Sequence, residues 1–283
     1  MDRYAVIGNP VAHSQSPFIH AAFAAQTGEA MEYGRLLCPL DGFEAAVRAF
    51  AAGGGRGCNV TVPFKFDASR LAAAQTPRAT VAGACNVLRF DAGVGWLGDN
   101  TDGVGLLRDI ERNANLTLRG RRVLLIGAGG AAAGVLGPLV AAGPAEVVVA
   151  NRTGAKATDL VSGQLARMAP ADRSGVAVRS APIEACGAAF DVVVNATATS
   201  LLDAAVPVAP TVLAAGTLAI DLMYGTAASG FLRWAEAHGA IARDGLGMLV
   251  EQAAAAFELF RGITPDTAPV LAALRARMEA PAA

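Results

Sequence analysis

Residues 123–132, VLLIGAGGAA, constrain the fold of this chain more than any other stretch. An apolar strand pattern leads directly into Gly127, Gly129 and Ala132, which have G-x-G-x-x-A spacing, and a helix pattern follows. The first glycine permits a tight turn, and the second lets backbone N–H groups approach a pyrophosphate at a helix N-terminus. We therefore expect a Rossmann dinucleotide-binding domain in the second half of the chain.

Strand-like and helix-like segments alternate from end to end, which predicts an α/β protein with parallel sheets. Ahead of the glycine turn we expect strands at 4–8, 58–62 and 95–98, and helices at 16–28 and roughly 41–52. The first of these helices has Ser16 as its expected N-cap, Pro17 at its first position and Gly28 as its stop.

After residue 121 the pattern restarts with four apolar runs, RRVLLIG, EVVVANR, DVVVNAT and LAIDLMY. Continuous apolar runs of this kind are typical of strands buried on both faces of a sheet. A chain of 283 residues is long enough for two domains, each with its own core. We place the seam between the domains near residues 100–104.

Composition excludes several classes of protein. The chain is 53% hydrophobic and 17% charged, which indicates a globular protein, and its net charge of −1 gives no footprint for nucleic acid. Four scattered cysteines without a C-x-x-C pair, and only three histidines, argue against a metal site and favour a reduced, cytoplasmic protein. Oligomeric state stays open between monomer and homodimer.

No membrane segment is expected. The apolar run at the N-terminus is too short for a signal peptide. Residues 123–145 carry no charge and could span a bilayer by length, but they contain six glycines and two prolines. A strand, a glycine turn and a helix explain that composition better.

The strand after the glycine turn bears on the choice of cofactor. NAD sites usually end this strand with an acidic residue that binds the ribose 2′-hydroxyl. Here the strand ends in Asn151, Arg152 and Thr153, and Lys156 follows within one turn. A guanidinium can pair with a 2′-phosphate, so NADP is favoured. The alternative is that Arg152 is an ordinary solvated loop arginine.

Several polar residues of the first half stand where strands meet helices. In NVTVPFK, Pro63 would end a strand and hold Lys65 at a rigid position. Ser14 and Ser16 stand at a helix N-terminus, where they could bind a carboxylate, although Ser16 could equally be only an N-cap. GDNTDG offers Asp99 and Asp102, and Asp102 could likewise be only a helix cap.

Gln252 lies on a helix in GMLVEQAAAAFELFRG. Helical spacing groups Gln252 with an apolar set, Met248, Ala256 and Leu259, and puts a charged set on the solvated face, Glu251, Glu258 and Arg261. A buried amide needs hydrogen-bond partners, so Gln252 is either a structural bridge or a ligand contact.

Together these motifs resemble the shikimate dehydrogenase family over nearly the whole chain. They are GNPVAHSQSPFIHAAF, GCNVTVPFK, AGACNV, LGDNTDGVGL, LLIGAGGAA, NRT, VNAT and DGLGMLVEQAAAAF. The resemblance implies reversible NADPH-dependent reduction of 3-dehydroshikimate to shikimate, on the chorismate pathway to aromatic amino acids. It also implies a substrate-binding catalytic domain at 1–103, completed by C-terminal helices at 246–283, and a Rossmann NADP-binding domain at 104–245.

The resemblance assigns roles to matching positions. Lys65 and Asp102 match the catalytic pair, and Ser14 and Ser16 match the residues that hold the substrate carboxylate. The other matching substrate residues are Asn59, Thr61, Asn86, Tyr224 and Gln252. The matching cofactor residues are Gly127, Ala128, Gly129, Gly130, Ala131, Asn151, Arg152, Thr153, Lys156, Gly245 and Met248.

Two segments depart from the family pattern. Residues 198–206 lack the usual serine and Gly-Met pair, which affects a loop expected beside the nicotinamide, and Ser229-Gly230 replaces a usual Thr-Pro. Three alternatives compete with this assignment: an NAD-linked enzyme that also accepts quinate, a non-catalytic nucleotide-sensing protein, and a methylene-folate-type dehydrogenase. The first lacks an acid near Asn151, the second would have lost Lys65 or Asp102, and the third would not need the serine pair.

Overall fold

The structure is a computed structural model that describes residues 1–91, 95–197 and 206–279. Its strands are β1 Asp2–Gly8, β2 Met31–Leu37, β3 Gly55–Val60, β4 Ala74–Gln75, β5 Val87–Asp91, β6 Gly95–Asp99, β7 Arg122–Ile126, β8 Glu146–Asn151, β9 Ala177–Pro182, β10 Phe190–Asn195, β11 Leu213–Asp221 and β12 Ile241–Arg243. Its α-helices are α1 Ser16–Thr27, α2 Phe43–Ala52, α3 Lys65–Leu71, α4 Pro77–Ala82, α5 Asp102–Arg108, α6 Gly130–Ala141, α7 Gly154–Arg167, α8 Ser229–Ala237, α9 Leu246–Arg261 and α10 Ala268–Glu279.

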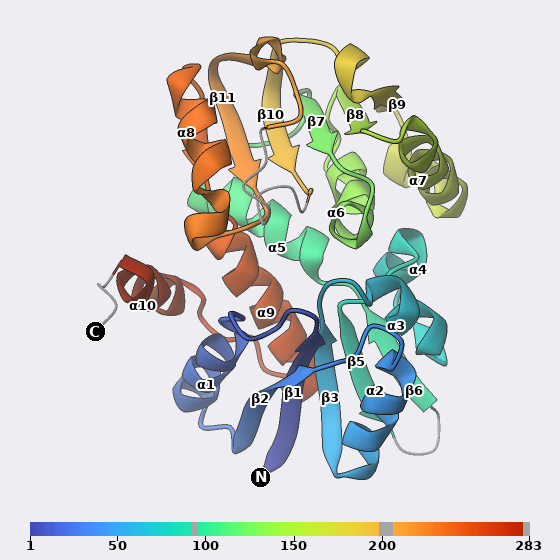
Figure 1. The fold of residues 1–283 in the computed structure, drawn as a ribbon, viewed down its shortest axis with the longest axis vertical. Coiled ribbons are helices and arrows are strands. Elements are labelled where there is room, and N and C mark those ends of the chain that lie inside the picture. The colour runs from blue at the N-terminus through green and yellow to red at the C-terminus, as the bar shows by residue number, and fades with distance from the viewer. Residues whose placement is uncertain (92–94, 198–205, 280–283) are drawn as a thin grey trace. The chain divides into compact units, whose positions relative to one another are not determined.

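The chain forms two compact units. Unit 1 comprises Met1–Leu106 with Leu249–Ala283, and unit 2 comprises Leu107–Met248. Each unit contains one six-stranded sheet with helices packed on it, so the predicted α/β class is confirmed (Figure 1). In the described ranges, no helix is both long and apolar enough to cross a bilayer.

The sheet of unit 1 has the order β2-β1-β3-β5-β6-β4. Strands β1, β2 and β3 are parallel, but β5 runs antiparallel to both β3 and β6. The expectation of a purely parallel sheet is therefore wrong here. Only residues 92–94 connect β5 to β6, and so short a connection permits antiparallel pairing alone.

The C-terminal helices pack on the first half of the chain, as expected. On α9, Phe257 contacts Phe23 of α1 with ring centroids 5.7 Å apart, and Phe260 contacts Tyr4 of β1 at 4.6 Å. Helix α10 in turn packs against α1. Helices α9 and α10 thus complete a core begun by the first strand.

The polar face predicted for α9 is wrong in part. Glu258 is exposed, but Glu251 is buried and its Oε1 accepts a hydrogen bond from Thr267 at 2.7 Å. Arg261 is mostly covered and forms ion pairs with Asp2 and Glu29. Packing by α10 and β1 covers charges that helical spacing alone assigns to solvent. Arg261 is paired there with two carboxylates, whereas Glu251 is held through one oxygen by a hydroxyl.

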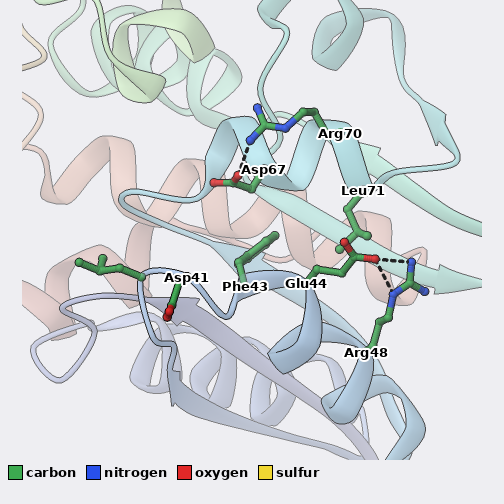
Figure 2. A pocket seen from close by; sticks show the side chains of 8 residues that line it. Asp41, Phe43, Glu44, Arg48, Asp67, Arg70 and Leu71 are labelled. Carbon is green, nitrogen blue, oxygen red and sulfur yellow. Dashed lines mark hydrogen bonds and ion pairs between the residues drawn. The ribbon is translucent and has the colours of Figure 1, made fainter.

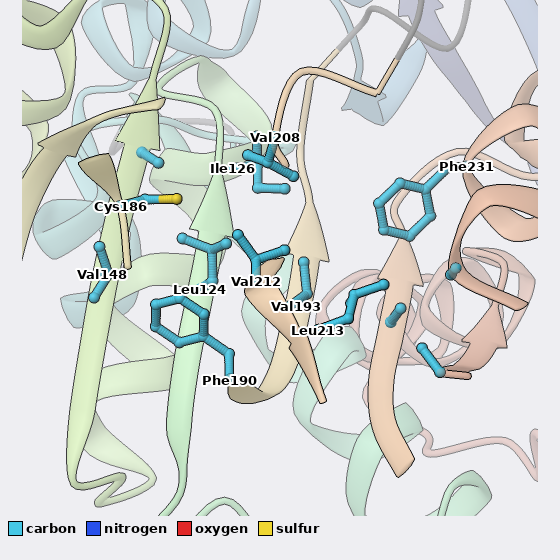
Figure 3. Packing of buried hydrophobic residues seen from close by; sticks show 14 of the residues in the cluster. Leu124, Ile126, Val148, Cys186, Phe190, Val193, Val208, Val212, Leu213 and Phe231 are labelled. Carbon is cyan, nitrogen blue, oxygen red and sulfur yellow. The ribbon is translucent and has the colours of Figure 1, made fainter. Parts of the chain in front are cut away.

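The sheet of unit 2 is entirely parallel, with the order β12-β11-β10-β7-β8-β9. Counted from β7, this is the 3-2-1-4-5-6 order of a Rossmann fold, whose switch point lies between β7 and β10. Figure 3 shows alternate residues of the central strands, including Leu124, Val148 and Val193, packed against Phe190 and Val212. This apolar core holds the carboxyl ends of β7 and β10 side by side.

Candidate active site

Lys65 begins a helix rather than ending a strand. Strand β3 ends at Val60, and the Phe64 N–H then donates to the Thr61 carbonyl at 3.1 Å to close a turn. Lys65 is the first residue of α3, so the expectation that it stands at a strand end is wrong. Pro63 lies inside this turn, where it has no N–H to satisfy. The turn and the first turn of α3 together fix the lysine backbone.

Lys65 and Asp102 form a buried ion pair. Nζ of Lys65 lies 2.7 Å from Oδ2 of Asp102, and the two side chains are only 12% and 6% exposed. Asp102 is the first residue of α5, and its N–H donates to Oδ1 of Asn100 at 3.1 Å. Asn100 is therefore the side chain that caps this helix, and the carboxylate of Asp102 is left to bind the lysine.

Asn86 connects the pair to α9. Its Nδ2 lies 2.9 Å from Oδ1 of Asp102, 3.0 Å from Oγ1 of Thr101 and 3.1 Å from Oε1 of Gln252. The Thr101 N–H donates to Oδ1 of Asn86 at 2.8 Å. Gln252 thus links α9 to the predicted site, and its polar partners Asn86 and Thr101 are buried with it.

Asn59 extends the network toward β2. Its Nδ2 donates to the Asn86 carbonyl at 3.4 Å, and its Oδ1 accepts from the hydroxyl of Tyr33 at 2.7 Å. Thr61, two residues farther on, is partly exposed, and its methyl group fills the space where a Cβ on Gly8 would lie. Among the predicted substrate residues of unit 1, Asn59, Asn86 and Gln252 are therefore joined to the Lys65–Asp102 pair.

The serine pair lies at the start of α1, but the predicted N-cap is wrong. Ser16 is the first helical residue, the N-cap position is Gln15, and no side chain caps through that position. Instead Oγ of Ser14 accepts from the Ser16 N–H at 3.3 Å, and the Ser14 hydroxyl donates to Oγ of Ser16 at 3.1 Å. Arg35 holds the Ser14 carbonyl through two N–H donors, at 3.0 and 2.6 Å. The predicted stop at Gly28 is confirmed by its left-handed backbone.

Asp99, the other acid of GDNTDG, has a structural role. It is fully buried, forms an ion pair with Arg78, and accepts from Thr76 Oγ1 at 2.5 Å and from the Asn100 N–H at 2.7 Å. Burial of Asp99 opposes its ionisation, but the hydrogen bonds and charge of Arg78 outweigh burial and lower its pKa. Asp99 anchors the segment that leads into Asp102.

The glycine turn of unit 2 has the geometry of an anion site. Gly127 has φ +116, and a Cβ there would lie 3.0 Å from the Ala196 carbonyl oxygen, so close approach of β7 and β10 requires glycine. Gly129 is exposed and a Cβ on it would meet open space. Helix α6 begins at Gly130, with Ala128 and Ala131 partly exposed around its N-terminus. Free N–H groups of the helix start are thus available to a phosphate.

The end of β8 carries cations and no acid. Asn151 is the last residue of the strand, and its Nδ2 donates to the Thr153 carbonyl at 2.9 Å, which closes the loop. Arg152, Thr153 and Lys156 are exposed. Among the described residues neither Arg152 nor Lys156 has a side-chain hydrogen bond or ion pair, so both charges remain available.

The remaining predicted residues also lie in unit 2. Tyr224 is partly buried just after β11, and Met248 is buried on the first turn of α9. Gly245 is required by packing, because a Cβ there would lie 2.4 Å from the Leu222 carbonyl oxygen. The loop predicted to border the nicotinamide, 198–206, lies outside the described residues except for Val206.

A separate pocket in unit 1 contains none of the predicted residues (Figure 2). Its lining includes Leu40, Asp41 and Phe43 beside two ion pairs, Glu44 with Arg48 and Asp67 with Arg70. Because these four charges neutralise each other at an exposed surface, we assign the pocket no ligand.

Sequence reasoning missed two residues of the network. Thr101 stands between Asn100 and Asp102, and its buried hydroxyl contacts Asn86 and Gln252, at 3.0 and 3.2 Å. Its neighbours in the motif could have drawn attention to it. Tyr33 on β2 has no such signal, because its contact with Asn59 joins two strands that are not adjacent in the sheet.

Three family models match this chain and together cover most of it. The shikimate dehydrogenase substrate binding domain matches residues 6–88, shikimate / quinate 5-dehydrogenase matches 109–207, and the shikimate 5'-dehydrogenase C-terminal domain matches 245–275. The first of these matches contains Lys65 and Asn86, and the last contains Gln252.

Named relatives and solved structures agree with these matches. The shikimate dehydrogenase (NADP(+)) of Methylibium petroleiphilum is 60% identical over 98% of this chain and 95% of its own length. That of an Acidovorax species is 55% identical over 99% and 98%. An Ael1 enzyme from Pseudomonas putida has a TM-score of 0.85 and 47% identity over 97% and 98%. Shikimate 5-dehydrogenase from Thermus thermophilus, in complex with NADP(H) and shikimate, has a TM-score of 0.81 and 30% identity over 98% and 100%. This chain belongs to the shikimate dehydrogenase family.

Proposed function

We propose that this protein catalyses the reversible NADPH-dependent reduction of 3-dehydroshikimate to shikimate. The observation that carries the proposal is the buried Lys65–Asp102 pair, held by Asn86 and Gln252 within unit 1. The relatives with 55–60% identity are named as NADP-dependent shikimate dehydrogenases. The protein is therefore an oxidoreductase that acts on a CH–OH group.

The residues of unit 2 fit NADP. The N-terminus of α6, with the open backbone at Gly129, would hold the pyrophosphate. Arg152 and Lys156 carry charges without partners among the described residues, and β8 ends without an acid, which suits a 2′-phosphate. We propose the remaining residues of these two loops, Ala128, Gly130, Ala131, Asn151 and Thr153, as further contacts, with Gly245 and Met248 beside them.

The chemistry required of unit 1 is proton transfer and charge stabilisation. When bound, NADPH supplies the hydride. A ketone that accepts hydride develops negative charge on its oxygen, and the ammonium of Lys65 would stabilise that charge and deliver a proton. Asp102 would hold the ammonium in place, and in the reverse direction Lys65 would take the proton from the hydroxyl. Both carboxylate oxygens of Asp102 have partners, which fixes its orientation.

The remaining polar residues would orient the substrate. Ser14 and Ser16 offer hydroxyls and helix N–H groups to the substrate carboxylate. We assign the ring hydroxyls to the polar set formed by Asn59, Thr61, Asn86, Tyr224 and Gln252. We further propose that the protein is cytoplasmic, since all four of its cysteines are free thiols, and that it acts as a monomer or homodimer without nucleic acid.

Absorbance of the reduced cofactor tests the proposal directly. The purified protein is assayed with shikimate or quinate, each with NADP or NAD. We expect the highest kcat/KM with shikimate and NADP. A preference for quinate and NAD would favour the NAD-linked alternative, and shikimate-independent binding of NADP without turnover would favour the nucleotide-sensing alternative.

A further inference from the structure

Tyr33 lies at one end of a hydrogen-bond chain that reaches the predicted catalytic pair. Its hydroxyl lies 2.7 Å from Oδ1 of Asn59, Nδ2 of Asn59 lies 3.4 Å from the Asn86 carbonyl, and Nδ2 of Asn86 lies 2.9 Å from Asp102. Tyr33 lies in β2, Asn59 in β3, Asn86 directly before β5 and Asp102 at the start of α5, so this series of hydrogen bonds crosses the sheet of unit 1 from β2 to β5.

A buried histidine fixes the ring of Tyr33. His20 of α1 stacks on Tyr33 with ring centroids 4.0 Å apart and planes 5° apart. His20 is 1% exposed; among the described residues neither ring nitrogen has a partner in full hydrogen-bond geometry, and the Asn59 side chain is the polar group that interacts with the ring. The imidazole is therefore neutral and acts as a flat packing surface, with Phe23 and Phe257 also around it. This stack packs one face of the Tyr33 ring, whose hydroxyl lies beside Asn59 and Ser16.

The Asn86 carbonyl and the hydroxyl of Tyr33 together hold the Asn59 amide in one orientation. An asparagine amide can rotate by half a turn and exchange its oxygen and nitrogen, unless its partners distinguish the two. Nδ2 of Asn59 faces a carbonyl, which can only accept, so the nitrogen must lie on that side. The hydroxyl of Tyr33 then donates to Oδ1 and restrains rotation of the amide away from this position. This arrangement leaves Asn59 one further N–H, which can donate to a substrate oxygen.

We infer that Tyr33 is a positioning residue for substrate binding, which acts by orienting the amide of Asn59. The inference rests on the proposed function, because Asn59 matters to catalysis only if the substrate has a hydroxyl or carbonyl oxygen there. An N–H that binds a hydroxyl not undergoing reaction stabilises the bound substrate and the transition state equally. Its misorientation therefore raises KM and leaves kcat nearly unchanged.

Tyr4 provides a matched control. It lies directly opposite Tyr33 in the register between β1 and β2, and it is a tyrosine of the same sheet that is more deeply buried than Tyr33. Its hydroxyl lies 3.4 Å from Nη1 of Arg261 and takes no part in the chain to Asn59. Tyr33→Phe and Tyr4→Phe each remove one hydroxyl and keep the ring, so both variants are expected to fold.

Steady-state kinetics with shikimate and NADP on four variants test the inference. Tyr33→Phe should raise the shikimate KM about 5-fold and leave kcat and the NADP KM within about 2-fold, as expected for loss of one neutral hydrogen bond. Tyr4→Phe should match the wild type. In a protein that already carries Asn59→Ala, Tyr33→Phe should not raise the shikimate KM further, because the amide through which Tyr33 acts is absent.

The outcomes separate this inference from the function on which it rests. A wild-type protein that does not oxidise shikimate refutes the proposed function, and the role of Tyr33 falls with it. If the wild type is active, three outcomes refute only the role of Tyr33. They are an unchanged shikimate KM in Tyr33→Phe, an effect of Tyr33→Phe on kcat alone, and an equal further rise in KM when Tyr33→Phe is added to Asn59→Ala. An equal effect of Tyr4→Phe would also refute it, as a general effect on the sheet.

Discussion

Nζ of Lys65 lies 2.7 Å from Oδ2 of Asp102, although the two residues are 37 positions apart and begin different helices. The other oxygen of the carboxylate accepts from Asn86, so each oxygen has its own partner. The side chain of Asp102 thus keeps one firm hydrogen bond when the lysine is removed. Substitution of Lys65 can therefore test catalysis without leaving the acid wholly unpartnered.

Lys65→Ala should lower kcat by about 10²- to 10⁴-fold, because the developing oxyanion loses both its proton donor and a nearby cation. The shikimate KM should change much less. Asp102→Asn, which keeps the shape of the side chain, should lower kcat similarly. Steady-state kinetics check both, with melting curves to confirm folding. Near-normal kcat in Lys65→Ala would contradict the assignment.

Arg152→Ala should weaken NADPH and leave NADH almost unchanged, since only NADPH carries a 2′-phosphate. A charge-assisted contact contributes about 1.5–3 kcal/mol, so the preference for NADPH should fall about 10- to 100-fold. Arg173→Ala removes another exposed arginine of unit 2 and serves as the control. Equal loss with both cofactors would point instead to adenine stacking or to folding.

Gly129→Ala separates cofactor binding from folding at the glycine turn. A Cβ at Gly129 meets open space and its backbone has φ −93, so alanine should leave the melting temperature nearly unchanged. The methyl group would nevertheless occupy the place where a pyrophosphate approaches the backbone, so the NADPH KM should rise about 10-fold or more. Gly127, with φ +116, should instead lose stability on substitution. A Gly129→Ala enzyme with normal NADPH KM would place the pyrophosphate elsewhere.

Ser14→Ala should lower stability more than Ser16→Ala, which is the reverse of what a helix N-cap at Ser16 would give. Ser14→Ala and Ser16→Ala should each raise the shikimate KM about 10-fold, because each removes a hydroxyl from the carboxylate site. Oγ of Ser14 also accepts from the Ser16 N–H, so Ser14→Ala should cost about 0.5–1 kcal/mol of stability at the start of α1. Ser16→Ala should cost less. Kinetics and denaturant unfolding of both variants decide this, and an unchanged KM in Ser14→Ala would remove the carboxylate from this site.

His20 should make the protein less stable as pH falls from 6.5. Burial lowers the pKa of His20 from 6.5 to about 3, so between these values the unfolded chain binds a proton that the folded protein does not. The contribution of His20 to the free energy of unfolding is therefore fully present above pH 6.5 and declines below it. At pH 5 the decline from this group is about 2 kcal/mol. The lowered pKa of Asp99 cannot cause this decline, because its contribution is lost only below its ordinary value of 3.8.

His20→Phe keeps a flat ring against Tyr33 and carries no titrating group. The difference in unfolding free energy between pH 7 and pH 5 should therefore shrink by about 2 kcal/mol in this variant. Urea unfolding of both proteins at the two pH values provides the measurement. An identical pH dependence in the variant would mean that another group is responsible.

The sequence by itself determined much of unit 2. Its strands are buried on both faces and its turns are short, so apolar runs and glycine spacing act within windows of a few residues. The turn at Gly127 and the absence of an acid at Asn151 are local features of this kind, and NADP followed from them. The fold class, the family and NADP dependence are confirmed, whereas the residue roles and domain boundaries stay predictions.

Only the tertiary structure decided how the polar residues of unit 1 meet. Asn86 and Gln252 lie 166 positions apart and 3.1 Å apart in space, and no local pattern encodes that distance. The antiparallel course of β5 and the burial of Glu251 likewise depend on which elements pack together. Tyr33 and Asn59 align with Tyr4 and Val6 of β1, two positions apart, so both side chains lie on one face of the sheet and meet there. Local propensity sets what each segment can form, and packing of distant segments sets which side chains become partners.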